Sequence, residues 1–332
     1  MSTDLAIYKQ NRISQLNTIY NAALLRLNND LATNLRNVRL SRSRNKQSII
    51  NSFVAAYNRS VATLTAKLNA EIAKVNAFVP KMGIGKTNKK KALLIGCNYI
   101  NTPYSLSGCI DDTTRMKEML SKRGFTDFKV LTDLTSTKPT RNNILKELGQ
   151  LISTSNPGDQ LFFYFSGHGS YTYDANGDET DGKDEMIIGT DLQGVKDDDL
   201  AAILYNGMKD GVLLVGLFDS CHSGTMLDLK YNYLDSDNYD KYTENNNVGE
   251  FKGDIIMISG CMDSQTSAEA VINNKVQGAL TWSLLDTLDK TPNCTWRELV
   301  NKMRDLLKSS GYTQIPQISS GAFENMDSGI IF

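Results

Sequence analysis

The sequence has 332 residues, 40% of them hydrophobic and 22% charged, and its formal net charge at pH 7 is −1. This length allows one large domain with a smaller unit, and the composition is normal for a soluble globular protein. The N-terminus lacks the pattern of a secretory signal, and no apolar run approaches the roughly 18 residues of a membrane span. Five scattered cysteines without a CxxC pair favour reduced thiols over a disulfide or zinc framework. We therefore expect a cytoplasmic protein without a membrane span.

Charge is distributed unevenly along the chain. Residues 1–80 contain 11 Lys and Arg against 3 Asp and Glu, which leaves 25 against 34 in the remainder. We expect the basic segment to dock on the acidic remainder or to form a solvated face. Binding to nucleic acid or to an anionic membrane is the less favoured alternative.

Residues 1–80 carry the pattern of two helices. Apolar side chains recur three or four positions apart over residues 13–38 and again over residues 50–75, and the polar stretch 41–46 separates the two series. This spacing predicts a helical hairpin with one apolar stripe on each helix. Each stripe has to be covered by the other helix, by the rest of the chain or by a second copy. We favour an intramolecular core, with oligomerisation or partner binding as the alternative.

A linker is predicted at residues 81–91, where glycines and three consecutive lysines follow Pro80. Beyond the linker, strand-like segments alternate with helix-like segments. This alternation predicts an α/β domain over residues 92–332, with a mainly parallel sheet between two layers of helices. Strands are expected at 92–98, 128–132, 159–165, 212–218, 254–259 and 316–319, and helices at 108–122, 140–153, 198–206, 277–288 and 295–309. Two polar, turn-rich insertions are expected at 171–188 and 227–253.

Two apolar runs lead into residues that suit covalent catalysis. One run ends near His168, which lies between Gly167 and Gly169, and a second run, 212–218, leads to Cys221. The carboxyl ends of neighbouring parallel strands meet at one edge of a sheet, where ligands bind and thiols ionise readily. We therefore predict Cys221 as nucleophile and His168 as general base and acid, although a buried, inert Cys221 is the alternative. Backbone amides of Gly169 and Cys221 are expected to bind the oxyanion, and no third catalytic residue is evident.

Three motifs resemble those of metacaspases, the caspase-like cysteine proteases of plants, fungi, protists and bacteria. They are LSGCIDD at 106–112, SGHG at 166–169 and DSCHSG at 219–224. The resemblance extends from about residue 91 to the C-terminus and leaves the first 85 residues outside it. It implies a caspase-like α/β/α sandwich with cysteine endopeptidase activity. The implied parts are a large-subunit-like segment 92–226, a junction loop 227–253 and a small-subunit-like segment 254–332.

Acidic residues near Cys221 predict the substrate. Asp219 lies two residues before Cys221, so it would face the same side of the strand and would need a cationic partner there. The resemblance implies a pocket for the Arg or Lys before the cleaved bond, formed by Cys109, Asp112, Ser166 and Asp219. In the alternative interpretation, Asp112 caps a helix and Asp219 accepts backbone hydrogen bonds.

A second set of acids predicts a bound cation. By resemblance to calcium-dependent metacaspases, the expected Ca²⁺ ligands are Asp184, Asp197, Asp198 and Asp228. A solvated acidic loop is the alternative. An EF-hand loop starting at Asp174 is disfavoured because its glycine stands at position 4 rather than 6.

The predicted function is a calcium-stimulated cysteine endopeptidase that cuts peptides or proteins after Arg or Lys through a Cys221 thioester. Lysines in the junction loop, namely Lys230, Lys241 and Lys252, and those at 89–91 offer sites for self-cleavage of a zymogen. One alternative is a catalytically silent scaffold that binds peptides and assembles through the helical hairpin. Another is a protease or transferase of the same fold with a different specificity. The hairpin differs from the leaders of other metacaspases, so its role stays open.

Overall fold

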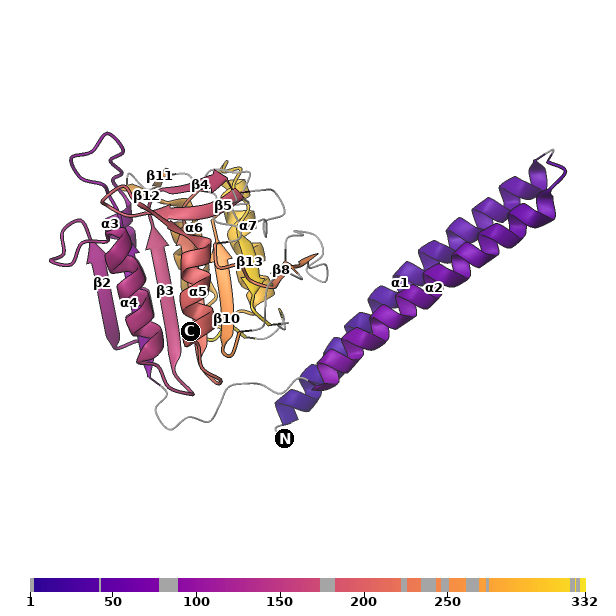
Figure 1. Ribbon diagram of the computed structural model, residues 1–332, viewed down its shortest axis with the longest axis horizontal. Helices are drawn as coiled ribbons and strands as arrows, with labels where there is room; N and C mark the ends of the chain where they lie inside the picture. Colours follow the sequence, from indigo (N-terminus) through magenta and orange to yellow (C-terminus); the bar gives the residue numbers. More distant parts are fainter. Residues whose placement is uncertain are drawn as a thin grey trace. The chain divides into compact units, whose positions relative to one another are not determined.

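The computed structural model describes residues 3–41, 43–77, 89–173, 183–221, 226–233, 243–245, 251–260, 269–272, 275–322, 326 and 329–332 (Figure 1). The chain divides into two compact units, Met1–Pro80 and Lys81–Phe332. The division falls at the N-terminal side of the stretch of glycines and lysines that precedes the first strand.

The first unit is a hairpin of two long helices, α1 (Thr3–Leu40) and α2 (Lys46–Ala77). The helices lie side by side along their length, and Tyr20 Oη of α1 lies 3.1 Å from Thr65 Oγ1 of α2, within hydrogen-bond distance. Burial is shallow: among the side chains described in this unit, only Val38 and Val75 are buried, at 8% and 2% exposure. Two helices without a further layer shield only the seam between them.

An eight-stranded sheet forms the centre of the second unit. Its strands are β1 (Lys90–Gly96), β2 (Asp127–Thr132), β3 (Gln160–Ser166), β7 (Leu213–Asp219), β8 (Tyr231–Tyr233), β9 (Thr243–Glu244), β10 (Asp254–Ser259) and β13 (Gln317–Ser320). Their order is β2-β1-β3-β7-β10-β13-β8-β9. The first five strands are parallel, whereas β13, β8 and β9 each run antiparallel to the preceding strand in this order. The mainly parallel sheet predicted from the sequence is confirmed.

Helices cover both faces of this sheet. They are α3 (Cys109–Lys122), α4 (Arg141–Ser153), α5 (Asp197–Gly207), α6 (Ala279–Lys290) and α7 (Trp296–Ser309). Successive side chains of a strand point to opposite faces. Ala92 and Leu94 of β1 therefore share a core with α3, α6 and α7, whereas Leu93 and Ile95 share a core with α4 and α5. The two cores confirm the α/β/α sandwich, and α4 and α5 lie in front of the sheet in Figure 1.

Two small antiparallel sheets are not predicted by the sequence pattern. One consists of β4 (Gly169–Tyr173), β5 (Lys183–Ile188) and β6 (Gly194–Lys196), and the other of β11 (Glu269–Ile272) and β12 (Lys275–Gly278). The first sheet includes part of the segment that was expected to be a polar insertion. Its short polar strands lack a clear apolar alternation, so the sequence pattern does not predict them. The helix expected from residue 277 begins instead at Ala279, after Gly278 adopts an extended backbone as its N-cap.

No helix in the described part of the chain is both long and apolar enough to cross a membrane. The four cysteines in that part carry free thiols, and Cys97, Cys109 and Cys294 are buried. Cys221 is partly exposed, which distinguishes it from the other three. The cytoplasmic location expected from the sequence stays a prediction.

Candidate active site

The carboxyl ends of β3 and β7 bring the two predicted catalytic motifs together. Ser166 lies opposite Asp219 in the parallel register of these strands, and the Gly167 N–H donates to the Asp219 carbonyl oxygen at 3.3 Å. His168 and Cys221 each follow the last residue of their strand by two positions. Both residues therefore leave the sheet at the same edge, where open α/β sheets bind ligands.

Glycine at position 169 permits a close approach between these two segments. A Cβ atom at Gly169 would lie 1.9 Å from the Cys221 carbonyl oxygen and 3.2 Å from the Cys221 nitrogen. Only a residue without a side chain fits at such a distance from another backbone. The amides of Gly169 and Cys221, which are the predicted oxyanion donors, therefore belong to adjoining segments.

Two tyrosines hold His168. The His168 N–H donates to Tyr99 Oη at 2.8 Å, and Tyr99 Oη donates to the Ile188 carbonyl oxygen at 2.8 Å. The Tyr99 and His168 rings pack with their centroids 4.7 Å apart. His168 Nε2 lies 2.8 Å from the Tyr104 carbonyl oxygen. Because a carbonyl oxygen only accepts hydrogen bonds, Nε2 carries the hydrogen, and Nδ1 is the basic nitrogen.

Asp112 and Asp219 meet at the start of α6. The Gly278 N–H donates to Asp112 Oδ2 at 2.6 Å. Asp219 Oδ2 accepts from the Thr281 N–H at 2.9 Å and from Thr281 Oγ1 at 2.7 Å. The positive end of the helix dipole favours negative charge at this position. The alternative interpretation expected Asp219 to accept a backbone hydrogen bond, and the Thr281 N–H supplies one. Asp112 lies in the first turn of α3.

Burial and repulsion oppose the ionisation of Asp112. Its side chain is fully buried, and burial, followed by the charge of Asp219, raises the pKa of Asp112 to about 7. Arg115 forms an ion pair with Asp112 from the next turn of α3 and also donates to Gln277 Oε1. This guanidinium supplies the positive partner that a buried carboxylate requires.

The other two predicted pocket residues lie at the same edge. Ser166, at the end of β3, is 2% exposed. It pairs with Gly96 of β1, and a Cβ atom at Gly96 would lie 2.5 Å from the Cys109 carbonyl oxygen. The structure thus gathers Cys109, Asp112, Ser166 and Asp219 where β1, β3 and β7 end.

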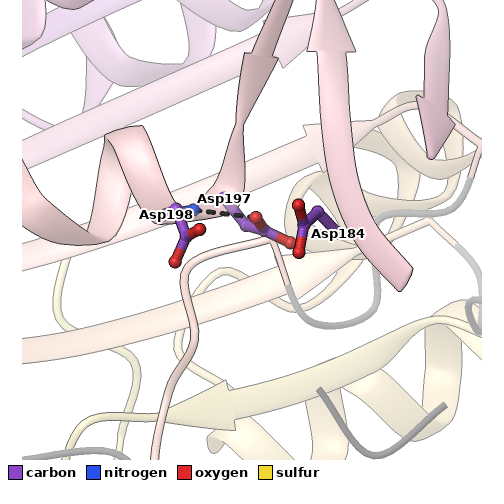
Figure 2. Close-up of side chains that lie close together, drawn as sticks. All are labelled: Asp184, Asp197 and Asp198. Atoms are coloured by element: carbon purple, nitrogen blue, oxygen red, sulfur yellow. Dashed lines mark hydrogen bonds between the residues drawn. The ribbon is translucent and has the colours of Figure 1, made fainter. Parts of the chain in front are cut away.

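A second group of carboxylates lies between β5 and α5 (Figure 2). One oxygen from each of Asp184, Asp197 and Asp198 lies within 4.8 Å of the others. Asp197 accepts from its neighbour Asp198 N–H at 2.7 Å and from the Glu185 N–H at 2.7 Å, so it ties the helix to the strand. Asp228, the fourth predicted ligand, is not a member of this group.

The chemistry of this group fits a hard divalent cation. Carboxylate oxygens are the ligands that Ca²⁺ prefers, and Asp184 and Asp197 are buried. Lys196 forms an ion pair with Asp184, and its hydrogen bond to that carboxylate raises the pKa of the Lys196 amine. Asp174, the first residue of the disfavoured EF-hand, lies outside the described residues.

Comparison with known proteins assigns the family. Residues 90–230 match the family model described as metacaspase, peptidase C14 domain. Metacaspase-1 of Meyerozyma guilliermondii is 34% identical over an alignment of 294 residues that covers 73% of this chain and 72% of that protein. Metacaspase-1 of Mycosarcoma maydis is 36% identical over 290 residues, which cover 72% of each chain. The chain belongs to the metacaspase family.

Metacaspases of the C14 family are cysteine peptidases, so the predicted enzyme class is confirmed. A crystal structure of a protein from Geobacter sulfurreducens superposes with a TM-score of 0.54 at 24% identity, over 71% of this chain and 95% of that chain. That likeness shows the fold. The caspase-like architecture expected from the sequence is therefore confirmed for this metacaspase.

Several residues at these sites carry no clear signal in the sequence. Tyr99 and Tyr104 follow β1 in a loop without a recognisable motif, yet they hold His168. Thr281 is 62 positions from Asp219, so only the folded chain pairs them. Lys196 is the exception, because a lysine directly before three aspartates could have been noticed as their counter-charge.

The close approach at Gly169 yields a first prediction for this metacaspase. Gly169→Ala should lower kcat for peptide hydrolysis by at least about a hundredfold, because the segments of His168 and Cys221 must separate. Gly149→Ala is the matched control: a Cβ atom there meets nothing within 4 Å in α4, so kcat should not change. A Gly169→Ala enzyme with parental kcat would contradict the proposed packing of the two segments.

Tyr99 yields a second prediction. It is 1% exposed, has a left-handed backbone (φ 49°) and bonds to both His168 and Ile188. Tyr99→Phe should lower kcat by about tenfold with little change in KM, because the His168 N–H loses its hydrogen bond to Tyr99 Oη and the segment that carries the imidazole is held less firmly. Tyr233→Phe, which removes another buried hydroxyl far along the sheet, is the control and should leave kcat unchanged. Equal effects of the two substitutions on kcat would argue for a merely structural role.

Proposed function

We propose that this metacaspase is a calcium-stimulated endopeptidase that cleaves peptides or proteins after Arg or Lys. The observation that carries the proposal is the meeting of the His168 and Cys221 segments at one sheet edge, beside buried Asp112 and Asp219. A thiol and an imidazole supply a nucleophile and a proton carrier. Two buried carboxylates favour the binding of a cationic substrate side chain over a neutral or acidic one.

In the proposed reaction, His168 Nδ1 takes the proton of the Cys221 thiol, and the thiolate attacks the carbonyl carbon of the scissile bond. The amides of Gly169 and Cys221 donate to the oxyanion of the tetrahedral intermediate. As the C–N bond breaks, a thioester forms, and the imidazolium gives its proton to the leaving amine. A water molecule then passes a proton to the imidazole and attacks the thioester, which frees the new carboxyl end, and Cys221 regains its proton. The contact of Nε2 with Tyr104 supports Nδ1 in this role.

The pocket for the Arg or Lys side chain is proposed to consist of Cys109, Asp112, Ser166 and Asp219. Each carboxylate oxygen has more than one lone pair, so existing hydrogen bonds leave room for a further donor. A substrate cation would share Asp112 with Arg115 or displace it. An acidic substrate side chain would add a third negative charge to a buried pair, which is strongly unfavourable.

The proposed calcium ligands are Asp184, Asp197 and Asp198, whereas Asp228, the fourth ligand expected from the sequence, lies outside the group that they form. The convergence of the first three carboxylates supports this assignment (Figure 2). When bound, Ca²⁺ would neutralise their mutual repulsion. Because Asp197 already joins β5 to the start of α5, the same residues would order the segments that flank the substrate edge. We expect a requirement in the millimolar range, as is typical of weak sites.

Self-processing is proposed at accessible lysines. Lys89 and Lys252 are exposed. Lys91 lies in β1 at 8% exposure, and its ammonium donates to the Thr154 carbonyl oxygen at 2.8 Å. Cleavage requires an accessible backbone. The Lys89 N–H donates to Asp159 Oδ1 at 3.0 Å and its carbonyl oxygen accepts from the Gln160 N–H at 2.9 Å, so Lys252 is favoured over Lys89 and Lys91. Lys241 lies outside the described residues.

Hydrolysis of an arginine-terminated fluorogenic peptide tests the proposed function. The intact protein should turn the peptide over only with Ca²⁺, and Cys221→Ala should lower kcat by at least about a thousandfold. Full turnover in excess chelator would remove calcium from the proposal. Turnover of an aspartate-terminated but not an arginine-terminated peptide would contradict the pocket.

The chain beginning at Lys89 tests the role of the basic hairpin, whose docking on the acidic catalytic unit is part of the proposal. If the shortened chain hydrolyses the peptide and the intact protein does not, the hairpin is an inhibitor. If neither chain hydrolyses the peptide, the alternative of a non-catalytic, peptide-binding scaffold is favoured. Equal activity of both would argue against inhibitory docking.

The pKa of Asp112 generates a pH prediction. Because that pKa is raised to about 7, Asp112 is mostly neutral below this pH and mostly ionised above it. Calorimetry should show that an arginine-terminated peptide binds Cys221→Ala roughly tenfold more tightly at about pH 8 than at about pH 6. The added substitution Asp112→Asn should remove most of this difference. Equal affinity of the Cys221→Ala protein at both pH values would contradict the role of Asp112.

A further inference from the structure

Lys196 places a positive charge among the acids of the proposed calcium group. Its ammonium forms an ion pair with Asp184. The Asp184 side chain is 2% exposed, whereas that of Lys196 is 35% exposed. A nearly inaccessible carboxylate is thus balanced by an ammonium that can still reach water.

The strand register explains why Lys196 reaches this acid. In the antiparallel pair of β5 and β6, Lys196 lies opposite Met186. Alternate residues of a strand share a face, so Asp184 lies on the same face as Met186, diagonal to Lys196. Long side chains span such diagonals. The ion pair therefore follows from the sheet itself.

Neighbouring charges have other partners. Asp199, the third acid at the start of α5, accepts from Arg141 at 2.7 Å. Lys183, which adjoins Asp184 in β5, places its ammonium 3.9 Å from the centroid of the Tyr171 ring. Within the described chain, Lys196 is the one cation paired with Asp184.

We propose that Lys196 is a tethered counter-cation that competes with Ca²⁺ for these acids, so that the ion binds by displacing the ammonium from Asp184. The inference rests on the calcium site of the proposed function and adds the residue that sets its affinity. An ammonium and a hard dication meet the same need of a buried carboxylate for positive charge. Because Lys196 is attached to the site, its effective concentration is high, and Ca²⁺ binding is weakened.

Calorimetric titration of Ca²⁺ into the intact chain tests this proposal, with Cys221→Ala in every protein to prevent self-cleavage. Lys196→Met removes the charge and keeps a long, flexible side chain. We expect it to lower the Kd for Ca²⁺ by roughly three- to tenfold, because Asp184 no longer has an internal partner to release. Ca²⁺ should also raise the unfolding temperature of Lys196→Met more than that of the parent.

Two matched variants separate this effect from net charge. Lys196→Arg keeps the cation, and Lys183→Met removes a lysine charge beside Asp184 without removing its ion pair. Neither should lower the Kd by more than about twofold. Binding by the parent with no gain in Lys196→Met, or an equal gain in Lys183→Met, overturns the role of Lys196 and leaves the calcium site standing. If neither the parent nor Lys196→Met binds Ca²⁺ at millimolar concentration, the proposed calcium site is wrong, and the role proposed for Lys196 is wrong as well.

Discussion

Carboxylates buried near the carboxyl edge of the sheet require positive partners, and this requirement shapes both charged sites. Asp112 pairs with Arg115, and Asp184 pairs with Lys196. Asp219 is instead satisfied by the hydroxyl and amide of Thr281 at the start of α6. Without these partners, burial would protonate the acids or destabilise the fold. Each of these buried carboxylates therefore has a charged or polar partner in the places where external cations are proposed to bind.

Catalytic geometry depends on backbone contacts more than on the side chains that perform the chemistry. The register of β3 with β7 aligns the two motifs, and Gly169 lets their segments touch. Tyr99 and the Tyr104 carbonyl then fix the loop and the imidazole of His168. These contacts come from the loop that follows β1, and they restrict the positions that His168 can take relative to the Cys221 segment.

The helical hairpin differs from the catalytic unit in having few buried side chains and an excess of positive charge. Its two helices lie against each other, but they cover only the seam between them. Few of its side chains are deeply buried, and most of its surface is available to solvent. The basic character of the hairpin and the acidic character of the remainder favour their attraction.

The sequence by itself determined the hairpin, the alternation of strands and helices, and the residue types of the dyad, because these appear as local periodicity and motifs. It also indicated which acids to consider, through resemblance. Only the tertiary structure decided their partners. Polar strands such as β5 carry no apolar alternation, so the small sheets and the diagonal pair of Lys196 with Asp184 were hidden. The contacts of His168 with Tyr99 and of Asp112 with Gly278 join distant segments, and local pattern holds no information on such pairings.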